Sequence, residues 1–556
     1  MFLKDIKSWA IDRLAKLPLE PLQEVLKSLL NAVEELTAKN NGLTEENQKL
    51  KDEINRLKGE KGKPEIKPSK DLSRDEPPES KKDPKARRTG LKCSKLDRIT
   101  ITRSRKIPID RSQLPADAEH KGWRRVIIQD LSLLSDNIEF ILERFYSPAL
   151  GKAFESSLPP GFAHHQFGPH LRAFVITLHY QCRITQKVIQ TLLHGMGVVI
   201  SEGQVGEILL DEDHSGFHEE KEAVRRAGIE AQEFQQIDDT GARLNGQNCF
   251  TIVTCNDVFT SFTTSLHKDR LSALRALTGG YPLQYMINLA AIQYMRHKIS
   301  NRQLIKQIRT LVSLRLYSQA AFEHEIMGSS WFIKAKEIWK KYIIEGCALA
   351  AYHAGALGPC SKVLVCDDAP QFKDILEHLG LCWIHEGRHY KKLVPQNIHF
   401  QKCLDDFLDA FWKFYERLKN YKKDPTLDQS KKLSEDFDKL FTVDTDYYAL
   451  NHLIKKTKKK RDSLLLVLEF PKIPLHNNTA ELDIREKVIQ RKIRNCFRSW
   501  RGARASDTFL SLLATCRKQG LSFWRYILDR TLKAQTIAPL VALIRTRHTL
   551  AHPIAA

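Results

Sequence analysis

The chain has 556 residues, of which 42% are hydrophobic, and a formal net charge of +21. Its length and apolar content can supply several domains with packed cores, which excludes a wholly disordered protein. Eleven scattered cysteines without a Cys-x-x-Cys pair argue against a disulfide framework and a zinc ribbon. The N-terminus lacks the apolar core of a signal peptide, and no apolar run is long enough to span a bilayer. We therefore expect a reduced cytoplasmic protein without a membrane segment, and its positive charge favours an acidic partner such as nucleic acid.

Residues 1–60 carry a heptad repeat. Leucine occupies every seventh position, at Leu22, Leu29, Leu36, Leu43, Leu50 and Leu57. The second core position of the heptads holds Leu26, Val33, Asn40, Asn47 and Ile54. Leucine at one core position with asparagine at some of the others favours a parallel two-stranded coiled coil. We predict that this segment forms a homodimer or a higher oligomer; a single amphipathic helix packed on its own domain is the alternative.

Residues 61–107 are rich in Lys, Arg, Glu, Pro and Ser, which predicts a disordered basic linker. Its segment Lys81–Arg88 either contacts DNA phosphates without reading sequence or is a solvated tether.

Residues 108–230 are predicted to be mostly helical. Within them, residues 184–210 show a helix, a glycine-containing turn and a second helix capped by Ser201, as in a helix-turn-helix DNA reader. A plain helical pair is the alternative, because the second helix offers no cation for reading bases.

Residues 231–268 contain three β-rich runs, FQQIDDT, NCFTIVTCND and FTSFTTSLHK. They predict an antiparallel meander that opens an α/β domain, with Asp238 and Asp239 on its first strand. Further on, the apolar run KVLVCDDAPQF predicts a buried strand that ends at Asp367 and Asp368, and such strand ends often carry functional groups. The run LCWIH is predicted to be another short strand. A helical region follows, with an apolar packing stripe at Leu404, Phe407, Phe411, Phe414 and Leu418.

The segment HNNTAELDIREKVIQRK, residues 476–492, predicts an amphipathic helix. Glu481, Arg485 and Lys492 share one face of it, and Asn477 or Asn478 could cap its start. The predicted packing face consists of Leu482, Ile489 and Ile493. A carboxylate beside cations suits a place where a metal ion and phosphates meet; a surface helix with an ordinary ion pair is the alternative.

Acidic residues thus lie on a first strand, at the end of a later strand and on a late helix. This order is typical of an α/β ribonuclease-H-like fold, in which three carboxylates converge on two divalent ions. Mg²⁺ or Mn²⁺ would suit such a site, because hard cations prefer oxygen ligands.

Several strings resemble the transposases of the insertion-sequence-66 family. NNTAELDIREKVIQRK and GARASDTFLSLLATCRKQGLSFWRYI resemble the family's C-terminal signature, and QIDDTG resembles its first-aspartate motif. LVCDDAPQF followed by CWIHEGRHYKKL resembles the second-aspartate block. The resemblance implies that Asp238, Asp367 and Glu481 are the catalytic residues and bind the metal ions. It also implies DNA phosphate binding by Arg485, Arg491 and Lys492, and an active-site floor shaped by Cys382, His385 and Asn478.

Some points stay open beside this resemblance. Asp239 and Asp368 stand where the family usually has other residues, and adjacent strand residues face opposite sides, so either aspartate of each pair could be the ligand. Cys382 and His385 alone do not make a zinc site. The cysteine pairs of a zinc-binding segment found in many relatives are absent, and a helical stretch at about 279–358 exceeds the family pattern.

The expected organisation is a catalytic domain over residues 231–495, with helical insertions at about 279–358 and 398–465, followed by a helical region over 496–556. The resemblance implies a DDE-type DNA transposase that hydrolyses phosphodiester bonds at transposon ends and transfers the strand to target DNA. Its expected partners are both DNAs and accessory proteins encoded by the element, in the nucleoid of a bacterial cytoplasm. Two alternatives are a catalytically silent transposase that acts as a DNA-binding protein, and a ribonuclease-H-like nuclease that only hydrolyses.

Overall fold

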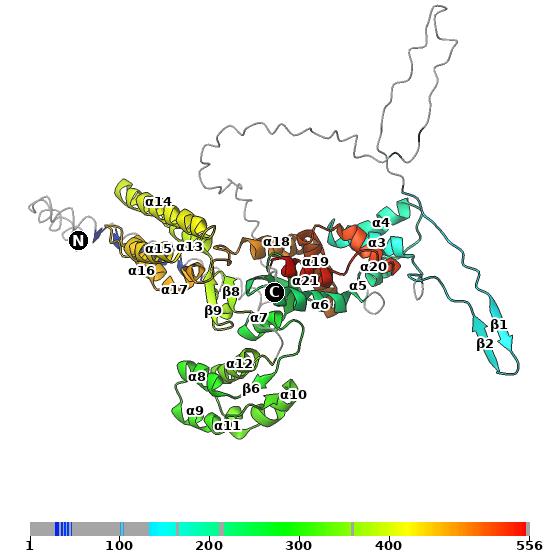
Figure 1. Ribbon diagram of the computed structural model, residues 1–556, viewed down its shortest axis with the longest axis horizontal. Coiled ribbons are helices and arrows are strands. Elements are labelled where there is room, and N and C mark those ends of the chain that lie inside the picture. The colour runs from blue at the N-terminus through cyan, green and yellow to red at the C-terminus, as the bar shows by residue number, and fades with distance from the viewer. Residues whose placement is uncertain are drawn as a thin grey trace, which may run out of the picture. The chain divides into compact units, whose positions relative to one another are not determined.

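The computed structural model describes residues 133–162, 166–210, 216–356 and 361–551, with scattered positions between 28 and 46 and residues 101 and 104. Nearly all of the predicted linker and most of the predicted coiled coil lie outside the described residues. The chain divides into two compact units, Asn40–Asp136 and the remainder, and the sheet with its helices belongs to the second (Figure 1).

Five strands form a mixed sheet in the order β5-β4-β3-β8-β9. They are β3 (Phe234–Leu244), β4 (Gln247–Cys255), β5 (Thr260–Ser265), β8 (Val363–Cys366) and β9 (His378–Leu381). The first three are antiparallel neighbours, whereas β8 and β9 run parallel to β3. Asn245 and Gly246, both with positive φ, join β3 to β4, which is the dipeptide that favours a tight hairpin. The expected α/β domain with its opening meander is confirmed.

The strand predicted at LCWIH is wrong. β9 ends at Leu381, which pairs with Cys366 of β8, and helix α13 (Trp383–Lys391) begins two residues later. The ring of Trp383 packs against Phe411 and Phe414. A short apolar run does not distinguish a strand from the start of a buried helix, so the sequence misassigned this segment.

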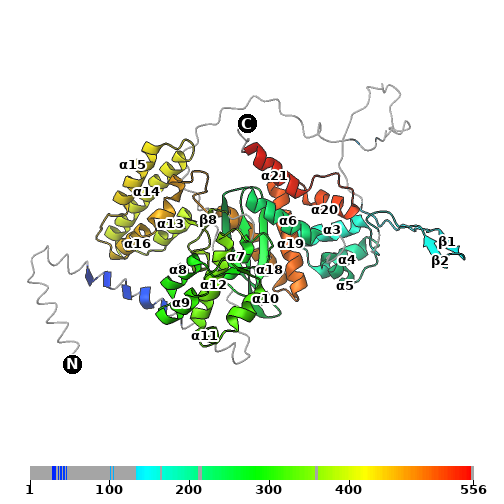
Figure 2. The same ribbon diagram turned by 60° about the horizontal axis from the view of Figure 1, so that its bottom comes forward.

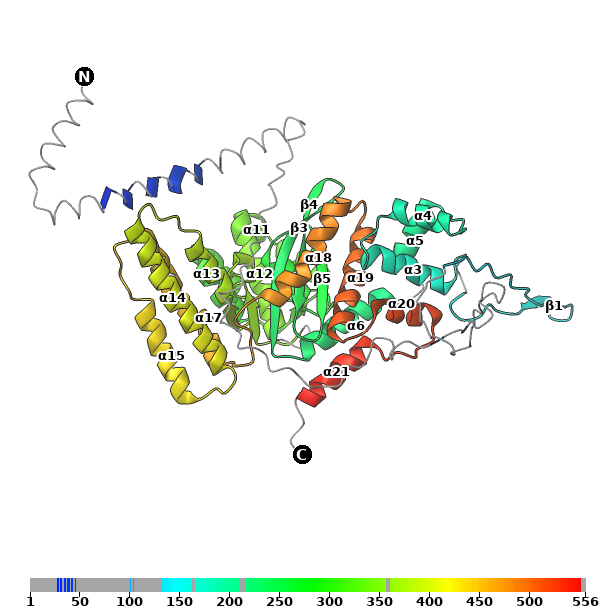
Figure 3. The same cartoon turned by 90° about the horizontal axis from the view of Figure 1, so that it is seen from above.

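Each face of the sheet is covered by its own core, because successive strand residues point to opposite sides. On β4, Ile252 belongs to one apolar cluster and Val253 to the other. The helices that contribute to the Val253 cluster include α6 (Phe217–Glu230), α18 (Asn478–Arg494) and α19 (Trp500–Lys518). Those on the Ile252 side include α7 (Arg270–Leu277) and α12 (Glu337–His353). Figure 3 shows α18 lying alongside the strands of the meander, where it contacts β3 and β4.

The two stretches predicted as helical insertions differ in content. Residues 279–358 include a two-stranded antiparallel sheet, β6 (Tyr285–Met286) with β7 (Leu316–Tyr317), that the helical prediction lacked. The helices there are α8 (Leu289–Lys298), α9 (Arg302–Arg309), α10 (Gln319–Phe322), α11 (Ser330–Ile333) and α12.

Residues 398–465 are helical, as predicted (Figure 2). Their helices are α14 (Ile398–Tyr421), α15 (Leu427–Leu440), α16 (Tyr448–Lys458) and α17 (Arg461–Leu464). The predicted stripe on α14, from Leu404 to Leu418, is buried, which confirms its packing role.

The prediction that residues 108–230 are mostly helical is wrong in one segment. β1 (Arg144–Ser147) and β2 (Lys152–Glu155) form an antiparallel hairpin, in which Phe145 pairs with Phe154. The turn between them ends at Gly151, whose φ of 58° suits glycine. Two runs of four residues are too short to show a clear period of two, so the hairpin escaped the sequence analysis.

Helices α3 (Pro169–Tyr180), α4 (Gln186–Gly195) and α5 (Glu202–Leu210) follow and pack on one another. Ser201 caps α5 as predicted. Its Oγ accepts the N–H of Gln204 at 3.2 Å, and the side chain of Gln204 accepts the N–H of Ser201 at 2.9 Å. This reciprocal pair fixes the start of the helix.

The C-terminal region is helical, as predicted, with α19 followed by α20 (Phe523–Leu532) and α21 (Leu540–Ala551). In the part of the chain that the structure describes, no helix has the length and apolar character needed to cross a membrane.

Candidate active site

The strands β3 and β8 bring two of the predicted carboxylates to the same edge of the sheet. Gln236 pairs with Val365 in the parallel ladder, and Asp238 and Asp367 each lie two residues further along. Burial, with smaller effects of the negative charges of Asp367, Asp239 and Glu481, raises the pKa of Asp238 to about 7 against one backbone hydrogen bond that lowers it. Asp238 is therefore close enough to Asp367 and Glu481 to be repelled by both carboxylates.

The second aspartate of each pair is engaged by cations. Lys268 Nζ lies 2.7 Å from Asp239 Oδ1, and Gln371 donates to Asp239 Oδ2 at 2.5 Å. Asp368 lies 2.8 Å from Lys373 Nζ and 3.0 Å from Lys460 Nζ, contacts that lower the pKa of its carboxyl against the effect of burial.

Asp238 and Asp367 have different surroundings. Asp238 Oδ1 accepts the N–H of Asp239 at 2.8 Å, and Asp367 Oδ1 accepts the N–H of Ala369 at 3.2 Å. Neither carboxylate forms an ion pair with any residue that the structure describes. Each pair thus contains one aspartate that is neutralised by lysine and one that retains oxygens for a ligand.

Glu481 lies in the first turn of α18, and Asn477 anchors that turn to β3. The side-chain amide of Asn477 donates to the carbonyl of Ile237 at 2.8 Å, and its backbone N–H donates to Cys382 Sγ at 3.2 Å. The prediction that Asn477 or Asn478 caps the helix with its side chain is wrong, because Asn477 stands at the cap position but its Oδ1 accepts no N–H of the helix and is buried without a hydrogen-bond partner among the described residues. Asn478, predicted to shape the site, is the exposed first residue of the helix.

The predicted packing face of α18 is also wrong. Leu482 is 64% exposed and Ile493 is 44% exposed. The buried residues of the helix are Ala480, Ile484, Lys487 and Gln490. Two of these are polar and find partners inside the protein, which a pattern of apolar residues cannot reveal.

The predicted floor residues Cys382 and His385 lie against Glu481. Cys382 immediately precedes α13 and His385 follows within its first turn, so a spacing of three places both on one side of the helix. His385 Nδ1 is 3.6 Å from Glu481 Oε1. The sulfur, a ring nitrogen of His385 and a carboxylate oxygen of Glu481 lie within 4.8 Å of one another, so this set could also hold a divalent ion. Burial raises the pKa of the Cys382 thiol, which favours its neutral form.

Arg388 is a further member of this group that the sequence analysis missed. Its Nη1 lies 3.3 Å from Glu481 Oε2 and 3.3 Å from His385 Nε2. It follows His385 by three residues on the same helix, and this spacing is the signal that could have identified it.

The predicted phosphate-binding cations lie along α18. Arg485 and Lys492 are exposed. Arg491 is half-buried, and its Nη1 donates to the carbonyl of Gly241 and, at 3.4 Å, to Thr240 Oγ1. Within the described residues, none of the three cations forms an ion pair with a carboxylate.

Residues 350–505, which extend from α12 into α19, match the sequence model of the family described as "Transposase IS66 family". This match places the chain in the class of transposases. The uncharacterized protein y4jO of Sinorhizobium fredii (strain NBRC 101917 / NGR234) is 34% identical over 322 residues, which cover 58% of this chain and 99% of that protein. The chain belongs to the IS66 family of transposases, as the resemblance implied. The matched segment contains Asp367, Cys382, His385 and Glu481, whereas Asp238 precedes it.

Proposed function

We propose that this protein is a DDE-type DNA transposase with a ribonuclease-H-like catalytic domain, in which Asp238, Asp367 and Glu481 form the catalytic centre. The observation that carries the proposal is that Asp238 and Asp367 lie two residues beyond the Gln236–Val365 pair of the parallel strands β3 and β8. The raised pKa of the half-buried Asp238, caused by burial and by the charges of Asp367 and Glu481, supports it. The sheet supports it, since an antiparallel meander followed by two parallel strands is the topology expected for that fold.

The donor set fits a hard divalent cation. Asp238 and Asp367 lack ion-pair partners among the described residues, and Glu481 Oε1 is buried without a hydrogen-bond partner there. Clustered carboxylates with mutual repulsion are stabilised by Mg²⁺ or Mn²⁺, which prefer oxygen ligands. Asp238, Asp367 and Glu481 would hold two such ions, which supply activation of the attacking oxygen and stabilisation of the leaving oxygen.

The other residues position these three. Asn477 ties the start of α18 to β3 beside Asp238, through the Ile237 carbonyl. His385 and Arg388 orient the carboxylate of Glu481 from α13. Exposed Arg485 and Lys492 attract the DNA phosphates along α18. The reaction is hydrolysis at the transposon end, followed by attack of the freed 3′ hydroxyl on target DNA.

The test is a cleavage and strand-transfer assay with Mg²⁺ or Mn²⁺, using DNA that carries the ends of the element. We expect Asp238→Asn, Asp367→Asn and Glu481→Gln each to lower the rate on the order of 10³-fold or more, as loss of a reacting group does in other enzymes. Asp239→Asn and Asp368→Asn are the matched controls, and they should retain most activity because their carboxylates are neutralised by lysine.

Near-normal joining by all three variants would contradict the proposal. Loss of activity in Asp239→Asn or Asp368→Asn, with retention in its neighbour, would move the metal ligand by one residue. Cleavage without joined products would instead assign a nuclease, and DNA binding without either product would assign a silent transposase.

A further inference from the structure

A cavity of about 470 Å³ lies beside α18, away from Glu481. The C-terminal half of α18 forms one wall and the end of β3, from Thr240 to Arg243, forms another. The end of α3, one side of α5, the first turn of α4, the segment between α18 and α19 and the start of α19 complete it. Its volume falls in the range of sites that enclose a small ligand or one part of a larger one.

The charged side chains that line the cavity are mostly cations, set among apolar and neutral polar residues. The cations are Lys187, Arg243, Lys487, Arg491, Arg494 and Arg498. Lys487 is paired with Asp507 at 2.6 Å, whereas the other five form no ion pair within the described residues. Among the described residues that line the cavity, Glu202 is the one carboxylate. Uncompensated like charges around a recess raise the local potential, so the recess attracts anions.

Two of the guanidinium groups are held in place by backbone carbonyls. Arg494 Nη2 donates to the carbonyl of His179, and Arg491 Nη1 donates to the carbonyl of Gly241. Arg494 Nε is buried without a hydrogen-bond partner in the described residues, and burial lowers the pKa of this guanidinium to about 10. Removing cationic groups from water in this way is unfavourable unless an anion compensates for it.

The cavity and the carboxylates lie along the same two elements. Glu481 and Arg491 are ten residues apart on α18, which corresponds to about 15 Å along a helix. Asp238 and Gly241 are three residues apart on β3, or about 10 Å along a strand. Because successive nucleotides of a duplex strand rise by about 3.4 Å, this separation spans roughly three to four nucleotides.

We propose that this cavity binds the phosphodiester backbone of the DNA strand whose reacting bond lies at the carboxylates, about three to four nucleotides away. The inference rests on the proposed function. A phosphodiester chain is the ligand that the geometry favours, because it places one anion at the carboxylate site and others at regular spacing along α18. The cavity fixes the position of the strand, whereas Asp238, Asp367 and Glu481 carry the reaction.

One experiment measures salt dependence of DNA binding. Fluorescence anisotropy with a random-sequence duplex in EDTA reports binding without catalysis. We expect Arg494→Gln with Arg498→Gln to reduce the slope of log affinity against log salt by about one, the value of one phosphate contact. Lys431→Gln with Lys432→Gln, which removes two exposed cations from α15, is the matched control and should change the slope less. Equal slopes for the two pairs would overturn the proposal; if Arg494→Gln misfolds, Arg498→Gln with Lys187→Gln replaces it.

A second experiment uses the cysteines of the protein as probes. Cys496 is exposed and lines the cavity, whereas Cys182 is exposed outside it. Saturating duplex should slow alkylation of Cys496, measured by peptide mass spectrometry, at least about tenfold while Cys182 reacts as before. If the protein binds the duplex but Cys496 is alkylated as fast as without DNA, the cavity is not the binding site, and the proposed function is unaffected. Equal protection by inorganic phosphate at matched ionic strength would make it a free-anion site, and absence of any DNA binding would contradict the proposed function itself.

Discussion

At the end of α3, burial keeps one histidine neutral. His179 has its pKa lowered to about 3, first by burial and then by the charge of Arg494, while its Nδ1 lies 2.9 Å from the Ile184 carbonyl. The ordinary value is 6.5, so between pH 6.5 and 3 the unfolded chain binds a proton that the folded protein excludes. This residue's contribution to stability is therefore complete above pH 6.5 and is lost as the pH falls.

We predict that acidification from pH 7 to 5 removes about 2 kcal/mol of unfolding free energy through His179, since one pKa unit corresponds to about 1.4 kcal/mol. His179→Gln should lack this contribution and show a shallower pH dependence. Denaturant titration of both proteins at the two pH values measures the difference. The same loss in both proteins would show that His179 is protonated in the folded state.

Single residues also show what could be deduced from the sequence about the site. Asp238 and Asp367 were predictable because Asp238 lies within a β-rich run, now β3, and Asp367 directly follows the apolar strand β8. Their neighbours Asp239 and Asp368 could not be separated from them, because each contacts a lysine from a distant segment: Lys268 and Lys460 are 29 and 92 residues away.

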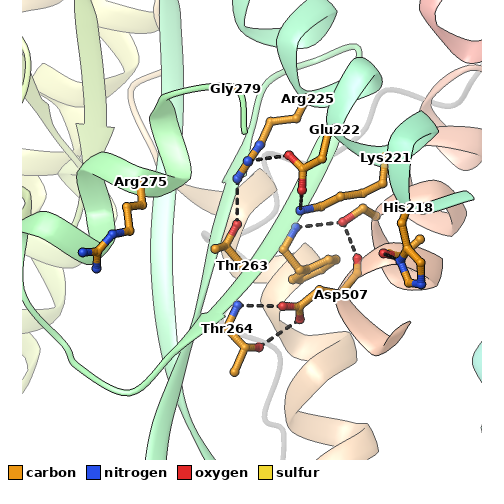
Figure 4. Close-up of polar contacts among 12 residues, drawn as sticks. His218, Lys221, Glu222, Arg225, Thr263, Thr264, Arg275, Gly279 and Asp507 are labelled. Carbon is orange, nitrogen blue, oxygen red and sulfur yellow. Dashed lines mark hydrogen bonds and ion pairs between the residues drawn. The ribbon is translucent and has the colours of Figure 1, made fainter. Parts of the chain in front are cut away.

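The elements around the site are joined by buried polar contacts that no sequence pattern predicts. Lys487 of α18 lies 2.6 Å from Asp507 of α19, and their side chains are only 4% and 9% exposed. Asp507 also accepts the backbone N–H and the hydroxyl of Thr264 on β5, at 2.7 and 2.9 Å. Figure 4 shows Asp507 with Thr264 next to a second group, in which Arg225 of α6 pairs with Glu222 and donates to Thr263 Oγ1. These contacts hold α18 and α19 on the sheet.

Removal of one charge from the α18–α19 pair should destabilise the fold. We predict that Asp507→Asn lowers the unfolding free energy by about 3–5 kcal/mol, because it leaves Lys487 buried without a counter-charge. In the Asp507→Asn background, Lys487→Met should lower the unfolding free energy much less than it does in the native chain. Glu416→Gln removes an exposed partner of Lys419 and should cost no more than about 1 kcal/mol. Urea unfolding of the native chain, the two single variants, the double variant and Glu416→Gln measures these changes, and additive effects of the Asp507 and Lys487 substitutions would refute the coupling.

At the level of elements, prediction succeeded where the chain repeats a local pattern. The meander was visible because β-branched and aromatic residues alternate over it and an Asn-Gly turn lies within it. The face of α18 was misjudged because its buried side includes Lys487 and Gln490, whose partners lie on other elements. Whether such residues are buried depends on their partners in distant segments and not on the local sequence pattern.

For the whole molecule, the sequence predicted an α/β domain with the acidic residues in the right order, because each acidic segment has a local signal. It did not reveal how distant segments meet. The cavity beside α18 is formed by α3, α4, α5, β3 and α19, whose lining residues span positions 179–506. Their convergence depends on tertiary packing, so the cations that line it look like ordinary surface residues in the sequence.

The heptad repeat of residues 1–60 makes a testable prediction about the oligomeric state of the whole chain. Leu29, Leu36 and Leu43, all at the same heptad position, are 54%, 64% and 59% exposed in the single chain. Burial of such leucines against a second copy would stabilise a dimer, with each fully buried side chain contributing about 1.5–3 kcal/mol.

We therefore predict that the full chain is a dimer or larger, and that Leu29→Asp with Leu36→Asp converts it to a monomer in sedimentation equilibrium. Ser28→Asp with Glu35→Gln changes the outer positions beside the same leucines and should leave the assembly intact. Because residues 1–60 are distant in sequence from the proposed catalytic residues, the monomeric variant should retain the affinity of one subunit for DNA while losing the proposed joining of two ends. A monomeric native chain, or an unchanged mass in the leucine variant, would exclude the N-terminal coil as the dimer interface.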